Sequence, residues 1–258
     1  MTELVRIDQA AEPAFSVEEH AIWRTLFARQ RPRVRQWACR DYLEGWDHLR
    51  LPADRIPTLA ELNARITPRT GWRTVRTSVR YTDALPWYHR FARREFLVTD
   101  YLRSWGELEF TPEPDMFHDI FGHLPFLTLP HYARLEELFA PAFLRADDRQ
   151  REDIKRLAWY STEFGVIREK GEIKAFGAGL ISSIAELESV MTGKVPIRPF
   201  TVENVVEHEK SVWSHNDVIF AIESIDQLAG ELARHFNSIP GASTGGPRRA
   251  LAPGEIFP

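Results

Sequence analysis

Two histidines, His118 and His123, stand five residues apart in a stretch that also holds residues suited to start and stop a helix. Asp115 follows a proline and is a good helix N-cap, so His118 is expected in the first turn of a helix with its ring pointing sideways. Gly122 favours the left-handed conformation that ends helices. We therefore expect the helix to end at Gly122, and this break to swing the His123 imidazole back toward that of His118. Two converging imidazoles need a third, anionic ligand to complete a metal site.

Glu163 is the best candidate for that third ligand. It lies within residues 159–165, where we expect a mid-helix position among aromatic and apolar residues. A carboxylate in such surroundings is costly to bury unless a cation compensates its charge. Two histidines and one carboxylate on one face of a metal leave the opposite positions open, which is the arrangement of iron(II) oxygenases. His118, His123 and Glu163 therefore predict a site for one catalytic, non-haem iron(II).

Two other interpretations of the histidine pair compete with this one. Neighbouring histidines are more often ordinary core or surface residues than ligands, but the aspartate cap, the glycine and the downstream glutamate together favour ligation. A zinc hydrolase of the zincin type needs His-Glu-x-x-His, with both rings one helical turn apart. The spacing here is His-Asp-x-x-x-His, which argues against that zinc site.

The elements that must position these side chains are mainly helical. Apolar residues recur at helical spacing after Ser16, which forms a capping box with Glu19, and a break is expected at Pro32. A second capping box begins at Thr58. Further helices are predicted over 87–94, 132–139, 147–167, 184–191 and 225–236, strands within 71–79, 96–98 and 218–222, and a tight bend over 176–180.

The predicted fold class is mainly α, an α+β arrangement with minor strands, in a single domain. A chain of 258 residues with 43% hydrophobic and 27% charged residues can bury one sizeable core. We expect a flexible N-terminal arm over residues 1–15, a catalytic domain over 16–237, and a mobile tail over 238–258, which begins with a segment rich in Gly, Pro and Ser.

Charge and cysteine content narrow the classes of partner. The formal net charge of −4 weighs against a nucleic-acid or anionic-membrane partner, which calls for a basic face. No apolar run approaches membrane-spanning length, and the first residues lack an apolar leader. The one cysteine, Cys39, excludes an internal disulfide and lies among apolar residues, so a buried thiol is expected. These features predict a protein of the reducing cytoplasm.

Three ordered blocks of the sequence resemble the tetrahydropterin-dependent aromatic amino acid hydroxylases. They read PDMFHDIFGHLP over 114–125, WYSTEFG over 159–165 and KAFGAGLISS over 174–183, and the likeness extends from about Ser16 to Phe236. The resemblance implies a catalytic domain like that of the bacterial phenylalanine 4-monooxygenases, with Fe(II), a tetrahydropterin cosubstrate similar to tetrahydrobiopterin, and O2. It implies ring hydroxylation of an amino acid of the phenylalanine or tryptophan type by a monomer.

The resemblance also implies roles for further residues. Arg103 aligns with the arginine that clamps the substrate carboxylate, a task that suits its planar fork, whereas a surface arginine in a basic helix is the alternative. Ser182 matches a serine that supports the first histidine and the substrate carboxylate. The other matches are Thr111, Pro114, Trp159, Phe164 and Gly179 in the amino acid pocket and Trp87, Asp119 and Ala158 on the pterin side.

Three departures from the family pattern bear on the pterin and the substrate. Residues 78–86 differ from the usual pterin loop, although Trp87 stands where the stacking ring is expected. Ala158 replaces an aromatic residue that usually lies beside the pterin, and residues 218–221 lack the tyrosine pair of phenylalanine hydroxylases. Two alternatives stay open: a specialised hydroxylase with a different aromatic substrate or ring position, and a non-catalytic relative that binds an aromatic ligand.

Overall fold

The computed structural model describes residues 13–109, 111, 113–209 and 215–240. Most of the expected arm (1–15) and tail (238–258) lies outside the described residues, so the domain boundaries remain predictions. No helix of the described part is long and apolar enough to cross a membrane.

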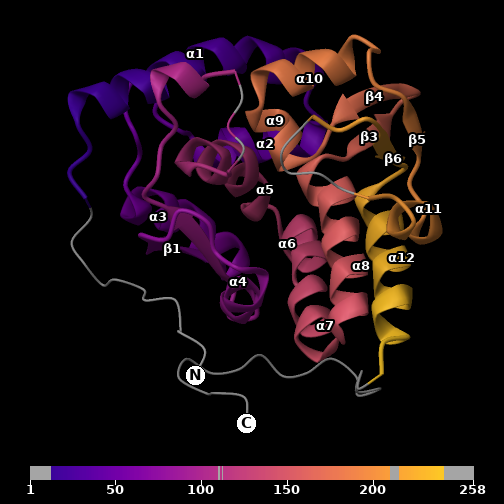
Figure 1. The fold of residues 1–258 in the computed structure, drawn as a ribbon. Helices are drawn as coiled ribbons and strands as arrows, with labels where there is room; N and C mark the ends of the chain where they lie inside the picture. Colours follow the sequence, from indigo (N-terminus) through magenta and orange to yellow (C-terminus); the bar gives the residue numbers. More distant parts are fainter. Residues whose placement is uncertain (1–12, 110, 112, 210–214, 241–258) are drawn as a thin grey trace.

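Helices predominate, and small strands join them (Figure 1). The α-helices are α1 (Val17–Trp37), α2 (Arg40–Leu49), α3 (Leu59–Thr70), α4 (Ala84–Phe91), α5 (Leu124–Leu127), α6 (Pro130–Glu136), α7 (Phe139–Arg145), α8 (Asp148–Ala158), α9 (Ala178–Ser182), α10 (Ile184–Met191), α11 (Val202–Val206) and α12 (Ile225–Asn237). One 3-10 turn, η1 (Trp105–Glu107), and two π-helical turns, η2 (His118–His123) and η3 (Trp159–Glu163), complete the helical segments. The strands are β1 (Arg73–Thr77), β2 (Glu95–Thr99), β3 (Val166–Glu169), β4 (Glu172–Ala175), β5 (Ile197–Pro199) and β6 (Ile219–Ile222).

The strands form two small sheets that flank the helices. β1 and β2 pair in parallel, and the second sheet has the order β4-β3-β6-β5, in which only β3 and β4 are antiparallel. In Figure 1 this second sheet lies beside α10, and α6, α7, α8 and α12 lie below it, where α6 contacts α12 and α7 contacts α8. The predicted class, mainly helical with minor strands in one domain, is confirmed.

Local capping signals begin the helices as the sequence predicts. The Ser16 hydroxyl accepts a bond from the backbone N–H of Glu19 while the Glu19 carboxylate bonds back, and Thr58 and Glu61 repeat the arrangement. Ser183 caps α10 in a related way. Each such cap contributes on the order of 1 kcal/mol by satisfying backbone donors that the helix leaves free.

Five details differ from the prediction. The expected break at Pro32 is wrong: α1 runs through it to Trp37, because Pro32 is exposed, where water can bond the carbonyl that its ring frees. The helix predicted over 147–167 ends at residue 163, and Ile167 lies in β3. The helix predicted over 132–139 is two helices, α6 and α7, and α4 begins three residues before the predicted start. The bend predicted over 176–180 passes at Ala178 into the short helix α9.

Aromatic rings form the core behind the histidine segment. Phe117 and Phe121 stack at 4.5 Å between ring centroids, and Phe121 meets Phe27 of α1 and Trp46 of α2 edge-on. Fully burying one such ring stabilises the fold by about 1.5–3 kcal/mol. These contacts anchor η2 to the two N-terminal helices and leave its other face free to carry chemistry.

Candidate metal centre

The segment η2 brings His118 and His123 together in a way that differs from the predicted helix break. Asp115 does cap the segment, since its Oδ1 accepts a bond of 3.0 Å from the backbone N–H of His118. Gly122, however, does not end the helix: residues 118–123 form a π-helical turn that continues into α5. In a π turn the bonded residues are five apart, so both imidazoles lie on one face.

Gly122 is required for a different reason. A Cβ atom at this position would lie 2.6 Å from the carbonyl oxygen of Ala178 in α9, closer than real Cβ contacts come. Gly122 therefore permits α9 to approach η2, and the close contact fixes the turn that carries both histidines.

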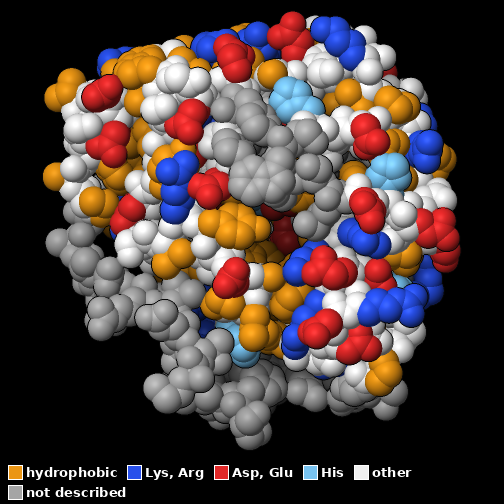
Figure 2. Space-filling view, in the orientation of Figure 1, with side chains coloured by type: hydrophobic (Ala, Val, Ile, Leu, Met, Phe, Trp, Pro, Cys, Tyr) orange, Lys and Arg blue, Asp and Glu red, His pale blue; other side chains and the backbone are white. Residues whose placement is uncertain are grey.

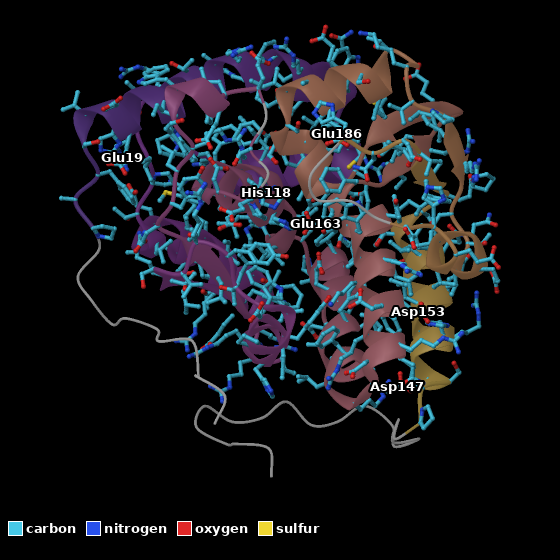
Figure 3. The ribbon with its side chains drawn as sticks, in the orientation of Figure 1. Glu19, His118, Asp147, Asp153, Glu163 and Glu186 are labelled. Carbon is cyan, nitrogen blue, oxygen red and sulfur yellow. The ribbon has the colours of Figure 1, made fainter. Side chains whose placement is uncertain are left out.

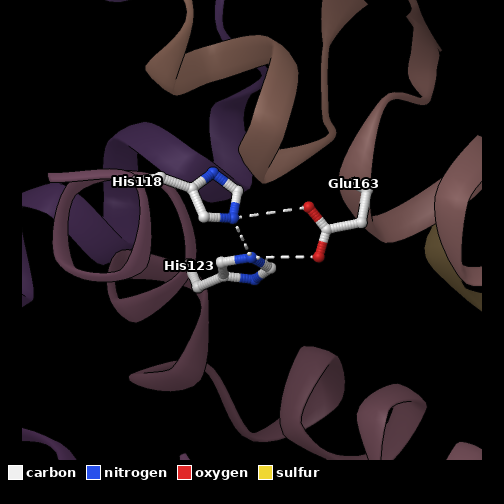
Figure 4. A group of neighbouring side chains, drawn as sticks. All are labelled: His118, His123 and Glu163. Carbon is white, nitrogen blue, oxygen red and sulfur yellow. Dashed lines mark hydrogen bonds and ion pairs between the residues drawn. The ribbon is translucent and has the colours of Figure 1, made fainter. Parts of the chain in front are cut away.

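Glu163 completes the cluster from the last residue of η3, and not from mid-helix as predicted. Its Oε1 lies 3.1 Å from His123 Nε2, its Oε2 lies 3.6 Å from His118 Nε2, and the two Nε2 atoms are 3.1 Å apart (Figure 4). Two adjacent donors bound at about 2.1 Å to one ion stand about 3 Å apart. The three donor atoms thus fit a single divalent cation without rearrangement.

The protonation states of the cluster also suit a cation. Burial lowers the pKa of His118 to about 4, so its imidazole is neutral at pH 7. Burial by itself raises the pKa of Glu163, but His123 outweighs it and brings the pKa to about 2. For His123, burial by itself lowers the pKa, but the charge of Glu163 outweighs the effect of burial, and the pKa of His123 is raised. A metal ion bound here would take the place of the proton that His123 and Glu163 share.

Ser182 lies against the first histidine, the one that the resemblance expects it to support. Its Oγ lies 2.9 Å from His118 Nδ1, on the side of the ring opposite the cluster. A contact of this kind fixes the orientation of the imidazole and leaves Nε2 for the metal.

Arg103 is a buried residue of a loop, so the alternative of a surface arginine in a helix is wrong. Its side chain is 3% exposed, and its Nε and Nη2 each donate a bond of 2.8 Å to the carboxylate of Asp115. Burial by itself raises the pKa of Asp115, but the Arg103 charge outweighs it and the pKa is lowered. One carboxylate therefore holds the guanidinium and caps η2.

A cavity of about 390 Å³ opens beside the cluster, and its lining contains all the residues expected to bind metal, substrate or pterin. Figure 2 shows its mouth as a hollow surrounded by apolar and charged side chains, and Figure 3 shows His118, Glu163 and Glu186 converging on it from η2, η3 and α10. The structure brings to its lining His118, His123, Glu163, Arg103, Thr111, Pro114, Trp159, Phe164, Gly179, Ser182, Trp87, Asp119 and Ala158.

The family model described as biopterin-dependent aromatic amino acid hydroxylase matches residues 7–242. The chain belongs to this family. It is an iron- and tetrahydropterin-dependent monooxygenase that uses O2 to hydroxylate the ring of an aromatic amino acid.

Several phenylalanine hydroxylases are similar to this protein over most of its length. The phenylalanine-4-hydroxylase of Mesorhizobium japonicum is 37% identical over 220 residues, 83% of this chain and 78% of the relative, and that of Vibrio cholerae is 32% identical over 216 residues, 82% and 73% of the two chains. The Chromobacterium violaceum phenylalanine hydroxylase with bound iron(III) and oxidised cofactor 7,8-dihydrobiopterin superposes with a TM-score of 0.81 at 31% identity, covering 86% of this chain and 82% of that one.

One wall of this hydroxylase's cavity is aromatic. The rings of Trp159 and Phe164 lie 4.5 Å apart and tilted by 41°. Gly179 makes room for Phe164, because a Cβ atom there would lie 2.6 Å from the phenyl ring. The Trp159 indole N–H donates to Asn216 Oδ1 at 2.7 Å, which fixes the indole in the wall.

The cavity lining also contains the residues matched to the pterin side. Trp87 packs against Phe91 and meets Phe96 edge-on, with 5.2 Å between the latter ring centroids. Asp119 accepts a bond of 2.9 Å from the Thr99 backbone, and burial raises its pKa to about 8. Residues 79–84, from the segment that departs from the family pattern, also line the cavity.

Two buried carboxyl groups near the site escape the sequence reasoning. Glu186 lines the cavity and accepts bonds from the backbone and side-chain N–H groups of Asn216 at 2.9 and 2.6 Å. Its place three residues after the Ser183 cap is a sequence signal that could have found it. Glu136 is 5% exposed on α6, and burial raises its pKa to about 7. No sequence signal marks it, because it looks like a polar residue of an amphipathic helix.

Proposed function

We propose that His118, His123 and Glu163 hold the iron of this hydroxylase and that phenylalanine is its substrate. The observation that carries the proposal is the convergence of three donor atoms, within 4.8 Å of one another, at the floor of a single cavity. When bound there, iron and the tetrahydropterin supply the electrons that reduce O2.

The side chains of the cavity would orient the two organic molecules beside this centre. Arg103 is held with its guanidinium at the cavity lining, where it can pair with the substrate carboxylate, since Asp115 occupies only its Nε and Nη2 in the described bonds. Trp159 and Phe164 would hold the substrate ring in the aromatic wall. Trp87 would stack on the pterin. This arrangement would bring the substrate ring and the reductant to the same metal.

The relatives favour phenylalanine over tryptophan, because the similar proteins described above are phenylalanine hydroxylases. The alternative is a different aromatic acid or ring position, which the altered segment 78–86 keeps open. Initial rates with phenylalanine, tryptophan and tyrosine, with the products identified by mass spectrometry and NMR, decide between them. A higher kcat/KM for tryptophan, or a product other than tyrosine from phenylalanine, would refute this part of the proposal.

Substitution of the carboxylate ligand tests the metal assignment. Glu163→Ala is expected to lose stoichiometric iron and at least about 100-fold in kcat, because two imidazoles alone hold the ion poorly. Glu223→Ala, which removes an exposed carboxylate outside the cavity, serves as the matched control. Iron content by metal analysis and tyrosine formation are measured on both. Full iron occupancy and turnover in Glu163→Ala would show that the ligand is wrong.

We also propose that the protein acts as a monomer in the cytoplasm. Cys39 is fully buried, and burial raises the pKa of its thiol, so it is an inert core residue that a reducing compartment preserves. Light scattering after size exclusion checks the monomer, and a stable dimer at micromolar concentration would overturn it.

A further inference from the structure

Gln30 is a polar side chain in an apolar place. It is fully buried in α1, on the face that also buries Leu26, Phe27 and Val34. Its Oε1 is buried and has no hydrogen-bond partner among the described residues. Burying an amide in this way costs free energy that an apolar side chain of similar length would not. The amide is therefore expected to have a specific task.

The other half of the amide reaches a chain segment that is distant in the sequence. Nε2 lies 2.5 Å from the carbonyl oxygen of Ile181 and 3.3 Å from that of Ser183. Because both neighbours are acceptors, the orientation of the amide is fixed. Gln30 thus donates to the peptide carbonyls on either side of Ser182.

Ser182 lies at the corner between two helices, α9 and α10. The helix α9 has five residues, and α10 begins two residues after it ends. A helix of that length is unstable on its own, so its position depends on tertiary contacts. Gln30 supplies such a contact at the end of α9 from which the Ser182 hydroxyl meets His118.

The first residues of α9 and its N-cap, Gly177, touch the site. Ala178 packs on η2 at Gly122, and a Cβ atom on Gly177 would lie 2.2 Å from the carbonyl oxygen of Glu163. Gly179 lies against the ring of Phe164. A small displacement of α9 would therefore be transmitted to both ligand-bearing turns and to the substrate wall, and misplacement by about 1 Å can cost about 100-fold in rate.

We propose that Gln30 is a positioning residue of this hydroxylase: by bonding the carbonyls that flank Ser182, it holds α9 so that Ser182 orients His118 and the three donor atoms keep their spacing. Gln30 contacts neither metal nor substrate and acts through Ser182. The inference rests on the proposed role of His118 as an iron ligand.

The variant Gln30→Met tests the inference, because methionine has a similar length and no donor. The dissociation constant for Co(II), the absorption spectrum of the Co(II) protein, kcat, the KM for phenylalanine and the Tm are measured. We expect Co(II) affinity and kcat to fall about tenfold, with a changed Co(II) spectrum and a nearly unchanged KM. The Tm is expected to stay within a few degrees of the wild type, since the variant also removes the unpartnered Oε1.

Val34→Ala is the matched control, from the same buried face of α1 about one helical turn away. It is expected to lower the Tm and to leave the Co(II) spectrum and kcat unchanged. A Gln30→Met protein whose Co(II) affinity, spectrum and kcat equal those of the wild type would overturn the inference. The inference would also be overturned if Val34→Ala, at the same Tm as Gln30→Met, lost as much Co(II) affinity and kcat, since this would indicate a structural role alone.

A double-mutant cycle with Ser182→Ala locates the pathway. If Gln30 acts through Ser182, Gln30→Met has little further effect on Co(II) affinity in the Ser182→Ala protein, whereas independent, additive losses contradict the inference. Should Gln30→Met fail to fold, Gln30→Glu keeps the shape, donates at most one bond when protonated, and is judged by the same readouts. The two proposals can fail separately. Retention of iron by Glu163→Ala or His118→Ala would refute the ligand assignment itself. If His118→Ala loses its metal but Gln30→Met behaves like the wild type, only the role of Gln30 is refuted.

Discussion

The two sides of the cavity are built differently. On the metal side, every residue of η2 is buried, and backbones meet directly at Gly122 and Gly177. On the side of residues 78–86, Val79 and Tyr81 are 38% and 56% exposed. There Arg80 pairs with Glu113 and lies over the ring of Tyr101.

This difference shows where the family's chemistry is constrained. Contacts between backbones in a packed interior tolerate almost no change in volume. Exposed ion pairs contribute only about 0–1 kcal/mol, so they can be exchanged with little effect on the fold. The metal side keeps the family pattern at its three ligands. Of the three departures, residues 78–86 fall on the exposed segment, where the binding of the pterin is open to change without disturbing the iron ligands, whereas residues 218–221 are buried.

The largest expected effect comes from the buried ion pair that joins η2 to the loop of Arg103. Asp115→Asn keeps a capping side chain but leaves the guanidinium of Arg103 buried and unpaired, which is expected to cost about 3–5 kcal/mol in the free energy of unfolding. Urea denaturation of the wild type and the variant at pH 7 measures this loss of unfolding free energy. Asp148→Asn, an exposed carboxylate at the start of α8, is the control and is expected to change little.

The pH dependence of this effect has a definite sign. The pKa of Asp115 is lowered from its ordinary value of 3.8, so the pair stabilises the fold fully above about pH 4 and loses this contribution as the pH falls through the folded pKa. The difference in unfolding free energy between wild type and Asp115→Asn should be constant between pH 7 and about pH 5 and shrink below about pH 4. A difference that grows on acidification would contradict the assignment.

A smaller but still clear effect is expected at the backbone contact on the metal side. Gly122→Ala places a methyl group 2.6 Å from the Ala178 carbonyl, which cannot rotate away, so about 1–3 kcal/mol should be lost together with iron affinity. Gly230→Ala in α12 meets only the flexible end of Arg234 at 3.5 Å and should stabilise the helix by about 0.5–1 kcal/mol. Thermal melts and iron titrations of both variants measure these effects. If the two variants had the same Tm and the same iron affinity, the tight packing inferred for the metal side would be wrong.

The smallest effect is expected on the exposed side and should be confined to the pterin. Trp87→Ala is expected to raise the KM for tetrahydropterin about three- to tenfold, the loss of one stacking contact, with unchanged iron content. Tyr81→Ala, an exposed ring of the same cavity lining, is the comparison and should have less effect. Initial rates at varied pterin concentration measure both, and an unchanged pterin KM in Trp87→Ala would remove that residue from the site.

Much of the site was predictable because its signals are local or chemical. The capping boxes at Ser16 and Thr58 involve neighbours three residues apart, and the structure confirms both. The family resemblance and the donor chemistry of His118, His123 and Glu163 led to one cavity whose lining contains every residue expected to bind metal, substrate or pterin. Gln30 and Glu136 stayed hidden, since nothing in their sequence neighbourhood shows what they face.

The sequence by itself determined the kind of metal site, through the residue types that can bind iron, and the starts of its helices, through caps that act within one turn. The tertiary structure decided how the donors meet. Gly122 reads as a helix stop in the sequence, yet its task is a contact with Ala178, 56 positions further along the chain. Glu163 reads as mid-helix, yet the helix ends there and is followed by β3, which pairs with β4 directly after it and with β6 about 50 positions further along the chain. A glycine that permits a distant backbone to approach has the same sequence signature as one that ends a helix, and only the packed fold distinguishes the two.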